Sequence, residues 1–229
     1  MTDTVTHPPT AALADASIRL GLAVQTAPVR LRPLRSGQLF AGPAAPVTHL
    51  GSVDVILEAI DDAPPGAVVV IDNGGREDEA CVGDLMVLEA LTAGLAGMLI
   101  WGRHRDTAQL LEIGLPVHSL GAHPFGPRRV PPAGRAMRTA FLDGVPVTPE
   151  DWVVADDDGA VIFPAEHRSD LYAAAAAVVA TETAQAMRMR AGASLRNQLD
   201  FAGYRSRQAS DPSLTLRRHL VERGRAIEV

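Results

Sequence analysis

The sequence predicts an α/β domain with a central mixed sheet, and three observations support this. Two continuous apolar runs, residues 67–72 and 97–101, have the composition of strands that are buried on both faces. A helical pattern over residues 84–94 lies between them, which predicts a parallel pair joined by a right-handed crossover. Hydrophobic residues make up 47% of the 229 residues and aromatic residues only 4%, as expected for helices packed on a Val/Ile-rich sheet.

Ahead of these strands, turns and helices alternate. Residues 1–9, which include a histidine and two prolines, are expected to be disordered. Residues 10–22 have the pattern of a short helix and turn, and residues 37–47 that of an extended segment broken by a glycine and a proline. Residues 52–66 are predicted to form a helix that Ser52 caps and two consecutive prolines end.

After the central helix, one more crossover follows and then the pattern changes. Residues 105–114 predict a short helix and residues 116–121 a third parallel strand. Beyond Pro124, short strands separated by Gly, Pro and Asp turns predict antiparallel additions to the sheet. The acidic stretch at residues 155–159 could suggest a metal site, but it fits the turn of a β-hairpin better.

The C-terminal part of the sequence is helical. A long Ala-rich helix is expected to begin at Ser169, and a last helix is expected to be capped by Asp211 and ended by Gly224. The chain is therefore divided into a catalytic domain over residues 10–168 and a helical extension over residues 169–229. The extension is expected to pack on the domain or on a neighbouring subunit.

Charge and cysteine content exclude several classes of protein. The formal net charge is −6 and the sequence pI is about 5.6, so the chain lacks the basic footprint of a nucleic-acid binder. With one cysteine it cannot form an internal disulfide, and a cytoplasmic location is expected. The N-terminal segment does not resemble a signal peptide, and no apolar run is long enough to span a membrane.

A run of charged side chains interrupts the chain where the second buried strand ends. Arg103, His104, Arg105 and Asp106 follow Trp101 after one glycine, and a helical pattern resumes at once. If the two buried strands are parallel neighbours, this run and the start of the preceding helix lie at the same carboxyl edge of the sheet. Open α/β sheets bind ligands at that edge, so the sequence predicts a site there.

The start of the preceding helix offers backbone donors for an anion. Gly83 and Asp84 stand at the helix start, so the amides of Leu85 and Met86 are expected to lack partners within the helix and to favour a carboxylate. In the alternative reading, Asp84 is an ordinary N-cap and Gly83 serves only a turn.

Arg105 and Asp106 supply the charges that a 2-oxo acid site needs. The guanidinium of Arg105 could hold a carboxylate or a developing oxyanion. Asp106 is a hard oxygen ligand, and one or two carboxylates with several waters commonly bind Mg²⁺. Together these groups could bind a 2-oxo acid, polarise its ketone and stabilise an enolate. The alternative is a solvated surface ion pair.

The motifs around these residues make the sequence resemble a known family. The stretches are "GAVVVIDNGG", "ACVGDLMVLEALTAGLAGMLIWGRHRDTAQLLEIGLPVHSLG", "LADASIRLGL" and "VTPEDWVVADDDGAVIFP". They resemble the family of the regulator of ribonuclease E activity A and the class II 4-hydroxy-4-methyl-2-oxoglutarate / 4-carboxy-4-hydroxy-2-oxoadipate aldolases. The resemblance covers roughly residues 10–165, and the tail beyond it is similar to an extension that only some members carry.

The resemblance implies roles for individual residues. Aldolase members have Gly-Asp at the helix start and Arg-Asp after the next strand, as this chain does, whereas the regulators lack the metal-holding aspartate. By resemblance, Asp106 would hold Mg²⁺ or Mn²⁺, Arg105 would contact the substrate and take part in catalysis, and Asp84 would act through ordered water in proton transfer. The remaining substrate contacts would come from the helix start: Gly83, Asp84, Leu85 and Met86.

The resemblance also implies a fold, an assembly and a reaction. The fold would be of the swivelling β/β/α type, in homotrimers or homohexamers with sites near subunit boundaries. The expected activity is retro-aldol cleavage of a 4-hydroxy-2-oxo acid to pyruvate, with possible decarboxylation of oxaloacetate. The alternative is a non-catalytic regulator that binds a ribonuclease or another protein. In some aldolases of the family a neighbouring subunit supplies a further acidic residue, to which the resemblance assigns no residue here.

Several other polar residues are given structural roles. His104 stands where the family usually has a small or apolar residue; with Arg103 it is expected to face solvent, although both could alter the substrate. Cys81 is expected to be an inert thiol, and His118 and His123 to be structural or surface residues. The acidic residues 77–79 are expected to form a solvated loop or to line the mouth of the pocket.

Overall fold

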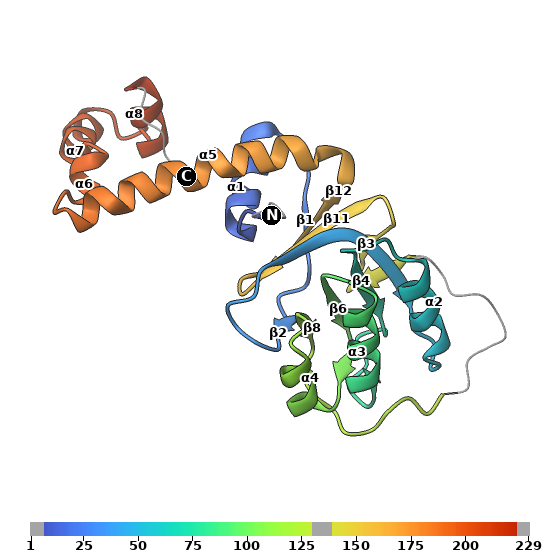
Figure 1. Cartoon of the computed structure of the whole chain (residues 1–229). Coiled ribbons are helices and arrows are strands. Elements are labelled where there is room, and N and C mark those ends of the chain that lie inside the picture. Colours follow the sequence, from blue (N-terminus) through green and yellow to red (C-terminus); the bar gives the residue numbers. More distant parts are fainter. Residues whose placement is uncertain (1–6, 130–138, 224–229) are drawn as a thin grey trace, which may run out of the picture.

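A mixed eight-stranded sheet forms the centre of the protein, with helices on both of its sides (Figure 1). The computed structural model describes residues 7–129 and 139–223. Across the sheet the strands are β1 (Gln25–Thr26), β12 (Gly159–Pro164), β11 (Asp151–Asp156), β3 (Phe40–Thr48), β4 (Val68–Asp72), β6 (Gly97–Trp101), β8 (Val117–Ser119) and β2 (Arg32–Pro33). The predicted α/β class with a central mixed sheet is confirmed.

The parallel half of the sheet contains the predicted β-α-β-α-β unit. Strands β3, β4, β6 and β8 are parallel neighbours. Three helices connect them: α2 (Asp54–Asp62), α3 (Asp84–Thr92) and α4 (Thr107–Ile113). The loops after β4 and β6 therefore leave the sheet at one carboxyl edge, as the sequence predicted.

Strand β4 shows why its run of apolar residues is continuous. Val69 and Ile71 belong to the hydrophobic cluster under α2, α3 and α4, whereas Val68 and Val70 belong to the cluster on the opposite face. All four side chains are fully buried. Burial of each such side chain stabilises the fold by about 1.5–3 kcal/mol, so both faces hold the strand in register.

The antiparallel half follows the predicted change of pattern. Strands β11 and β12 form a hairpin whose register closes at the pair Asp156–Gly159, so the acidic stretch is a turn. Strands β9 (Ala140–Leu142) and β10 (Val145–Val147) form a separate two-stranded sheet. The first residues of the strand expected after Pro124 fall within 130–138 and lie outside the described residues.

Strand β3 corrects one expectation, because it runs unbroken through Gly42 and Pro43. Residues up to Pro43 pair with β11, and from Ala44 onward β3 pairs with β4. A proline lacks the N–H that a ladder needs, and it is tolerated here where the strand changes partners. A Cβ at position 42 would lie only 1.9 Å from the carbonyl oxygen of Gly66, so this close approach requires glycine.

The ends of the helices also differ from expectation. Ser52 does not cap α2, whose N-cap is Val53 without a side-chain hydrogen bond. The last helix, α8 (Leu216–Glu222), is capped by Thr215, whose hydroxyl accepts the Arg218 N–H. Asp211 instead accepts hydrogen bonds from Ser213 within a turn. The N-caps of these two helices therefore lie one and four residues after the caps that the sequence predicted.

The N-terminal segment is described from residue 7, just before α1 (Thr10–Leu20). Residues 1–6 of the segment expected to be disordered lie outside the described residues. His7 Nδ1 lies 3.0 Å from the Tyr172 hydroxyl and Pro8 is buried, so residues 7 and 8 pack against the molecule instead.

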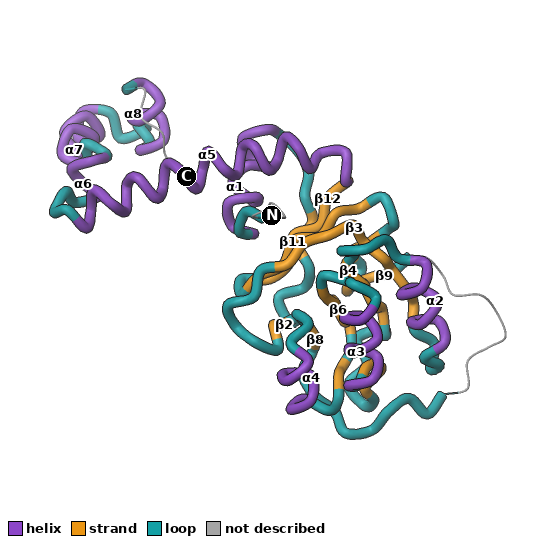
Figure 2. Tube along the Cα trace, in the orientation of Figure 1, coloured by secondary structure: helices purple, strands orange, loops and turns teal. Residues whose placement is uncertain are grey.

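The C-terminal extension begins on the domain and then leaves it. Helix α5 (Arg168–Arg190) follows a short 3₁₀ turn, η1 (Ala165–His167), and packs against α1 through Leu171, Ala175 and Val178. The distal helices are α6 (Leu195–Gln198), α7 (Phe201–Ser210) and α8. Figure 2 shows them at the far end of α5, away from the sheet. Within the described residues, no helix is long and apolar enough to cross a membrane.

Candidate active site

A small parallel pairing brings the two predicted site loops together. Strand β5 (Ala80–Val82) lies in the loop after β4, and β7 (Arg103–His104) lies in the loop after β6. The Arg105 N–H also donates to the Val82 carbonyl at 2.9 Å. The sequence pattern gave no sign of β5 or β7, because strands of two or three residues show no measurable period.

Asp106 points back toward the start of α3. Its Oδ2 accepts a hydrogen bond from the Asp84 N–H at 3.3 Å and lies 3.4 Å from Arg105 Nε. The backbone of Asp106 adopts the left-handed conformation, with φ 61° and ψ 41°. This conformation costs most residues about 1–3 kcal/mol, and aspartate tolerates it better than most. The predicted Gly-Asp and Arg-Asp motifs therefore meet in space.

Two glycines make room for these charged side chains. A Cβ at Gly83 would lie 2.5 Å from Asp106 Oδ2 and 3.1 Å from Arg105 Nε. A Cβ at Gly126 would lie 2.9 Å from Arg105 Nη1. Any larger residue at either position would displace the guanidinium or the carboxylate. Gly83, predicted as a substrate contact, is thus also a spacing residue.

The start of α3 differs from the prediction in its hydrogen bonds. Gly83 is the N-cap and Asp84 is the first helical residue, so the reading of Asp84 as an ordinary N-cap is wrong. The Leu85 N–H, expected to be unpaired, donates to Asp84 Oδ1 at 2.8 Å because that side chain folds back over the helix end. The Leu85 side chain is 77% exposed, whereas that of Met86 packs in the hydrophobic core.

A cavity of about 340 Å³ opens beside these groups. It is lined by Arg105, Asp106, Ala122, His123 and Pro124. The Arg105 and Asp106 side chains remain 48% and 35% exposed, so both can reach a ligand. The size suits a small organic acid.

The donors at this cavity fit a hydrated divalent ion. Within the part of the chain that the structure describes, no three His, Cys, Asp or Glu side chains converge into a metal cage. Asp106 is one accessible carboxylate at the cavity wall, and its Oδ2 accepts the Asp84 backbone N–H. Mg²⁺ usually keeps several waters and takes one or two carboxylates, so this donor set fits it.

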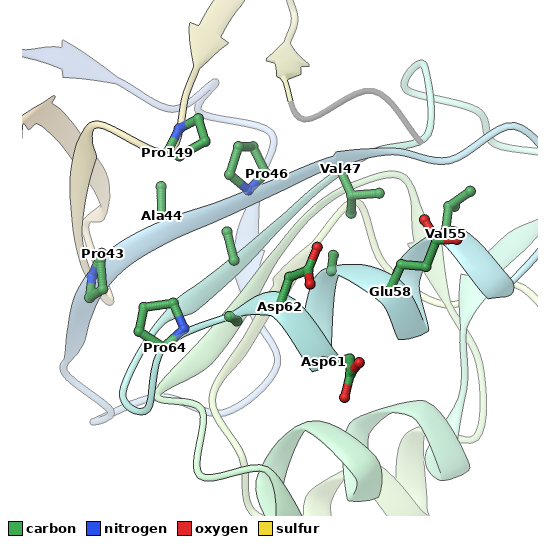
Figure 3. Close-up of a pocket in the computed structure, with 13 residues that line it drawn as sticks. Pro43, Ala44, Pro46, Val47, Val55, Glu58, Asp61, Asp62, Pro64 and Pro149 are labelled. Carbon is green, nitrogen blue, oxygen red and sulfur yellow. The ribbon is translucent and has the colours of Figure 1, made fainter. Parts of the chain in front are cut away.

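A larger hollow than this cavity lies elsewhere in the molecule. It has a volume of about 480 Å³ and lies between β3 and α2. Figure 3 shows Pro43 and Pro46 on the strand side and Glu58 and Asp61 on the helix side. Its lining residues include carboxylates but no cation. A 2-oxo acid would be repelled there, so we place the site at the smaller cavity.

His104 is buried rather than exposed to solvent, which corrects the expectation. Its Nδ1 lies 2.7 Å from Ser119 Oγ and its Nε2 lies 3.1 Å from Thr107 Oγ1. Burial, together with the positive charge of Arg103, lowers the pKa of His104 below its usual value. The residue joins β7, α4 and β8 in a polar contact beneath the site.

Arg103 also points away from the cavity. It is half-buried, and its Nη2 lies 3.5 Å from Glu77 Oε2. Glu77 and Asp78 are exposed and paired with arginines, as expected for a solvated loop. We therefore find no contact between these three side chains and the cavity lining.

Glu79 differs from its neighbours because it is buried. Its Oε1 lies 2.6 Å from Arg129 Nη2, and Arg129 also donates to Asn73 Oδ1 at 2.8 Å. The same oxygen of Asn73 lies 2.8 Å from His49 Nδ1. Burial alone would raise the pKa of Glu79, but the hydrogen bonds and charge of Arg129 outweigh it and hold the pKa below its usual value. This cluster ties the loop after β8 to the carboxyl edge of β3 and β4.

The other residues given structural roles divide into two groups. Cys81 is buried, which raises the pKa of its thiol to about 12, and it is therefore inert. His118 is buried with its Nε2 2.9 Å from the Asp156 carbonyl, so its structural role is confirmed. His123 is partly exposed, as expected for a surface residue, and it lines the cavity. The sequence held no signal for this, because the chain reaches the cavity only after passing through β8.

With the geometry in place, the protein can be compared with known families. The model of the RraA-like family, described as Aldolase/RraA, matches residues 10–162. The chain belongs to this family. The matched part of this RraA-like chain contains the full cavity lining and the start of α3.

Relatives of the RraA-like chain carry names from both branches of the family. A Deinococcus radiodurans protein named "Putative 4-hydroxy-4-methyl-2-oxoglutarate aldolase" is 32% identical over 72% of this chain and 99% of its own length. A Pseudomonas syringae protein structure described as uncharacterized has 27% identity and a TM-score of 0.71, over 83% of this chain and 92% of that one. The Streptomyces coelicolor RraAS2, described as an unusual member of the RNase ES inhibitor RraA family, has 27% identity and a TM-score of 0.65, over 80% and 93%.

Proposed function

We propose that this protein is a divalent-metal-dependent lyase that cleaves a 4-hydroxy-2-oxo acid to pyruvate. One observation carries the proposal: Arg105 and Asp106 line one cavity of small-molecule size, and Asp106 also accepts the Asp84 N–H at the start of α3. A 2-oxo acid needs an oxygen-ligated cation, a fixed positive charge and backbone donors, and Asp106, Arg105 and the neighbouring start of α3 would supply them. The relation to proteins named as putative 4-hydroxy-4-methyl-2-oxoglutarate aldolases supports the same reaction class.

Each residue has a distinct role in binding. Asp106 would hold Mg²⁺ or Mn²⁺, which when bound supplies a Lewis acid for the ketone oxygen of the substrate. The guanidinium of Arg105 would face the ketone oxygen and offset the negative charge that develops on it. The amides of Leu85 and Met86 would bind the substrate carboxylate. The Leu85 N–H donates to Asp84 Oδ1 in the structure, so the Asp84 side chain would rotate away when substrate enters.

Rotation of Asp84 would also prepare proton transfer. Its freed carboxylate, through an ordered water, would accept the proton of the C4 hydroxyl. The C3–C4 bond then breaks, C4 becomes a carbonyl carbon, and the bonding electrons form the enolate of pyruvate. Protonation at C3 releases pyruvate. Oxaloacetate would lose its C4 carboxylate as CO₂ through the same enolate, so the site should also decarboxylate it.

The test is release of pyruvate from oxaloacetate and from a 4-hydroxy-2-oxo acid with Mg²⁺ or Mn²⁺. We expect pyruvate that EDTA abolishes and added metal restores. Asp106→Asn should reduce the rate by at least about 100-fold, because the metal ligand is lost while the backbone conformation is kept. Activity that survives EDTA, or full activity in Asp106→Asn, would contradict the proposal.

The family also contains regulators, and the likeness to RraAS2 favours a second candidate function. In that case the protein would bind a ribonuclease or another protein and would catalyse nothing. Asp106 and Asp84 would then be dispensable. Capture of ribonuclease E by this chain, unaffected by EDTA and by Asp106→Asn, would favour the regulator.

A further inference from the structure

We propose that His123 is a specificity-determining residue that binds the second carboxylate of a 2-oxo dicarboxylate substrate. The inference rests on the proposed function, since it concerns the same cavity. It assigns to His123 a role that the Gly-Asp and Arg-Asp motifs do not supply. Oxaloacetate and 4-hydroxy-4-methyl-2-oxoglutarate, the compound in the relatives' name, both have a carboxylate at each end, and the role of His123 concerns the distal one.

The backbone of His123 is fixed against the residues beneath the site. Its N–H donates to the His104 carbonyl at 2.8 Å, and the neighbouring Ala122 forms a parallel bridge with His104. The next turn is tied to β5, because the Ala80 N–H donates to the Phe125 carbonyl at 2.7 Å. His123 is therefore anchored to both site loops, the one that carries Arg105 and Asp106 and the one that leads to Gly83.

The hydrogen bonds of the imidazole define which nitrogen can donate. The Phe125 N–H donates to His123 Nδ1 at 3.2 Å, so Nδ1 is an acceptor and carries no proton. The proton of the neutral ring is therefore on Nε2. Nε2–H is a donor without the means to accept, which suits a carboxylate oxygen and does not suit a cation.

Aromatic contacts restrict the rotation of the ring. The His123 and Phe125 ring centroids are 5.7 Å apart at an interplanar angle of 44°, and the Arg128 guanidinium lies 3.7 Å over the other ring. A donor held in place loses little conformational entropy when it binds a ligand. The tilted contact with Phe125 therefore helps to orient His123 at the wall of the cavity.

The composition of the cavity wall makes His123 the donor for the distal group. Arg105 is assigned to the 2-oxo end together with Asp106, which lies 3.4 Å from it. The remaining lining residues are Ala122, His123 and Pro124, of which only His123 has a polar side chain. A second carboxylate that enters the cavity would lose part of its hydration, and a hydrogen bond from His123 would offset that loss.

The experiment compares ligands that differ in one carboxylate. Calorimetry in the presence of Mg²⁺ would measure binding of 2-oxoglutarate, which has two carboxylates, and of 2-oxobutyrate, which has one. We expect His123→Ala to weaken 2-oxoglutarate about 10- to 100-fold, as for loss of a hydrogen bond to a charged acceptor, and to change 2-oxobutyrate less than about 2-fold. His123→Gln, whose amide can reach the position of Nε2, should recover most of the loss.

Two further measurements separate this inference from the proposed function. The KM for oxaloacetate should rise in His123→Ala, while the rate at which pyruvate exchanges its methyl protons in D₂O stays unchanged. His167→Ala, at an imidazole in η1 beside Glu166, is the matched control and should change nothing. If the wild type releases no pyruvate but the binding difference persists, the proposed lyase activity is contradicted, whereas the proposed role of His123 in binding is supported.

Three outcomes would overturn the role of His123. The first is equal weakening of both ligands in His123→Ala, which indicates a general loss of the site. The second is unchanged binding of 2-oxoglutarate. The third is no binding of 2-oxoglutarate by the wild type. Thermal unfolding of each variant would show whether a loss of binding reflects a loss of fold.

Discussion

Asp106 combines a chemical role with a backbone requirement. Its left-handed conformation is tolerated by Asp and Asn and costs alanine about 1 kcal/mol or more. Because its carboxylate also accepts the Asp84 N–H, removal of the side chain leaves that amide without its acceptor. The two effects can be separated by choosing the replacement.

We expect Asp106→Asn to unfold at nearly the same urea concentration as the wild type, and Asp106→Ala to be destabilised by about 1–3 kcal/mol. Asparagine keeps the oxygen acceptor and the backbone preference, and alanine keeps neither. Urea unfolding followed by circular dichroism measures both. Equal stability of the two variants would show that the left-handed backbone at Asp106 carries no cost.

Cys81 precedes Gly83 by two residues in the sequence, but it has no role in the proposed reaction. Its thiol is buried and its pKa is raised to about 12, so almost no thiolate exists at neutral pH. We expect a thiol reagent such as DTNB to react with the folded protein at least about 100-fold more slowly than with protein in urea. Fast labelling of the folded protein would show that β5 opens readily.

At the scale of elements, the sequence predicted the long ones and missed the short ones. The periodic or continuous patterns of α3, β4 and β6 are long enough to identify their type and order, and the structure confirms them. Strands β5 and β7 depend on each other across a gap in sequence, so neither has a local signal. The site divides in the same way. The Gly-Asp and Arg-Asp motifs could be identified from the sequence, whereas the position of His123 at the cavity depends on tertiary structure.

Buried histidines link several elements and make stability depend on pH. His49, His104 and His118 are buried, and burial lowers the pKa of each below its usual value of 6.5. Below about pH 6.5 these histidines therefore bind protons in the unfolded chain while they remain neutral in the folded chain. The free energy of unfolding must fall as pH falls through 6.5 and level off below the folded pKa values.

We expect the urea midpoint to decrease steadily from pH 7.5 to pH 5.5. This window excludes Glu79, whose lowered pKa stabilises the fold above about pH 4.5 and loses that effect only below it. His118→Gln should reduce the pH dependence, since one of the histidines with a lowered pKa no longer titrates while a donor toward Asp156 remains. A midpoint that is constant over this window would contradict the assignment.

At the scale of the whole molecule, one part of the chain makes few contacts with the rest. We call this part the distal arm; it consists of the end of α5 after Ala180 together with α6, α7 and α8. Figure 1 shows α6, α7 and α8 beyond the end of α5, away from the sheet. They have a small core of their own, in which Leu214, His219 and Leu220 are buried. The arm nevertheless leaves Met187 58% and Met189 46% exposed. Both lie in the last turn of α5, beyond the part of the helix that packs in the core.

We expect the arm to join subunits in the proposed homotrimer or homohexamer. A chain that ends at Ala180 keeps Leu171, Ala175 and Val178, which pack in the core, and loses the rest of α5 with α6–α8. It should keep its thermal transition within a few degrees, because the lost part lies outside the three main hydrophobic clusters. Light scattering should then report fewer copies per particle than for the full chain. The same number of copies in both would show that the arm packs on its own domain or on nothing at all.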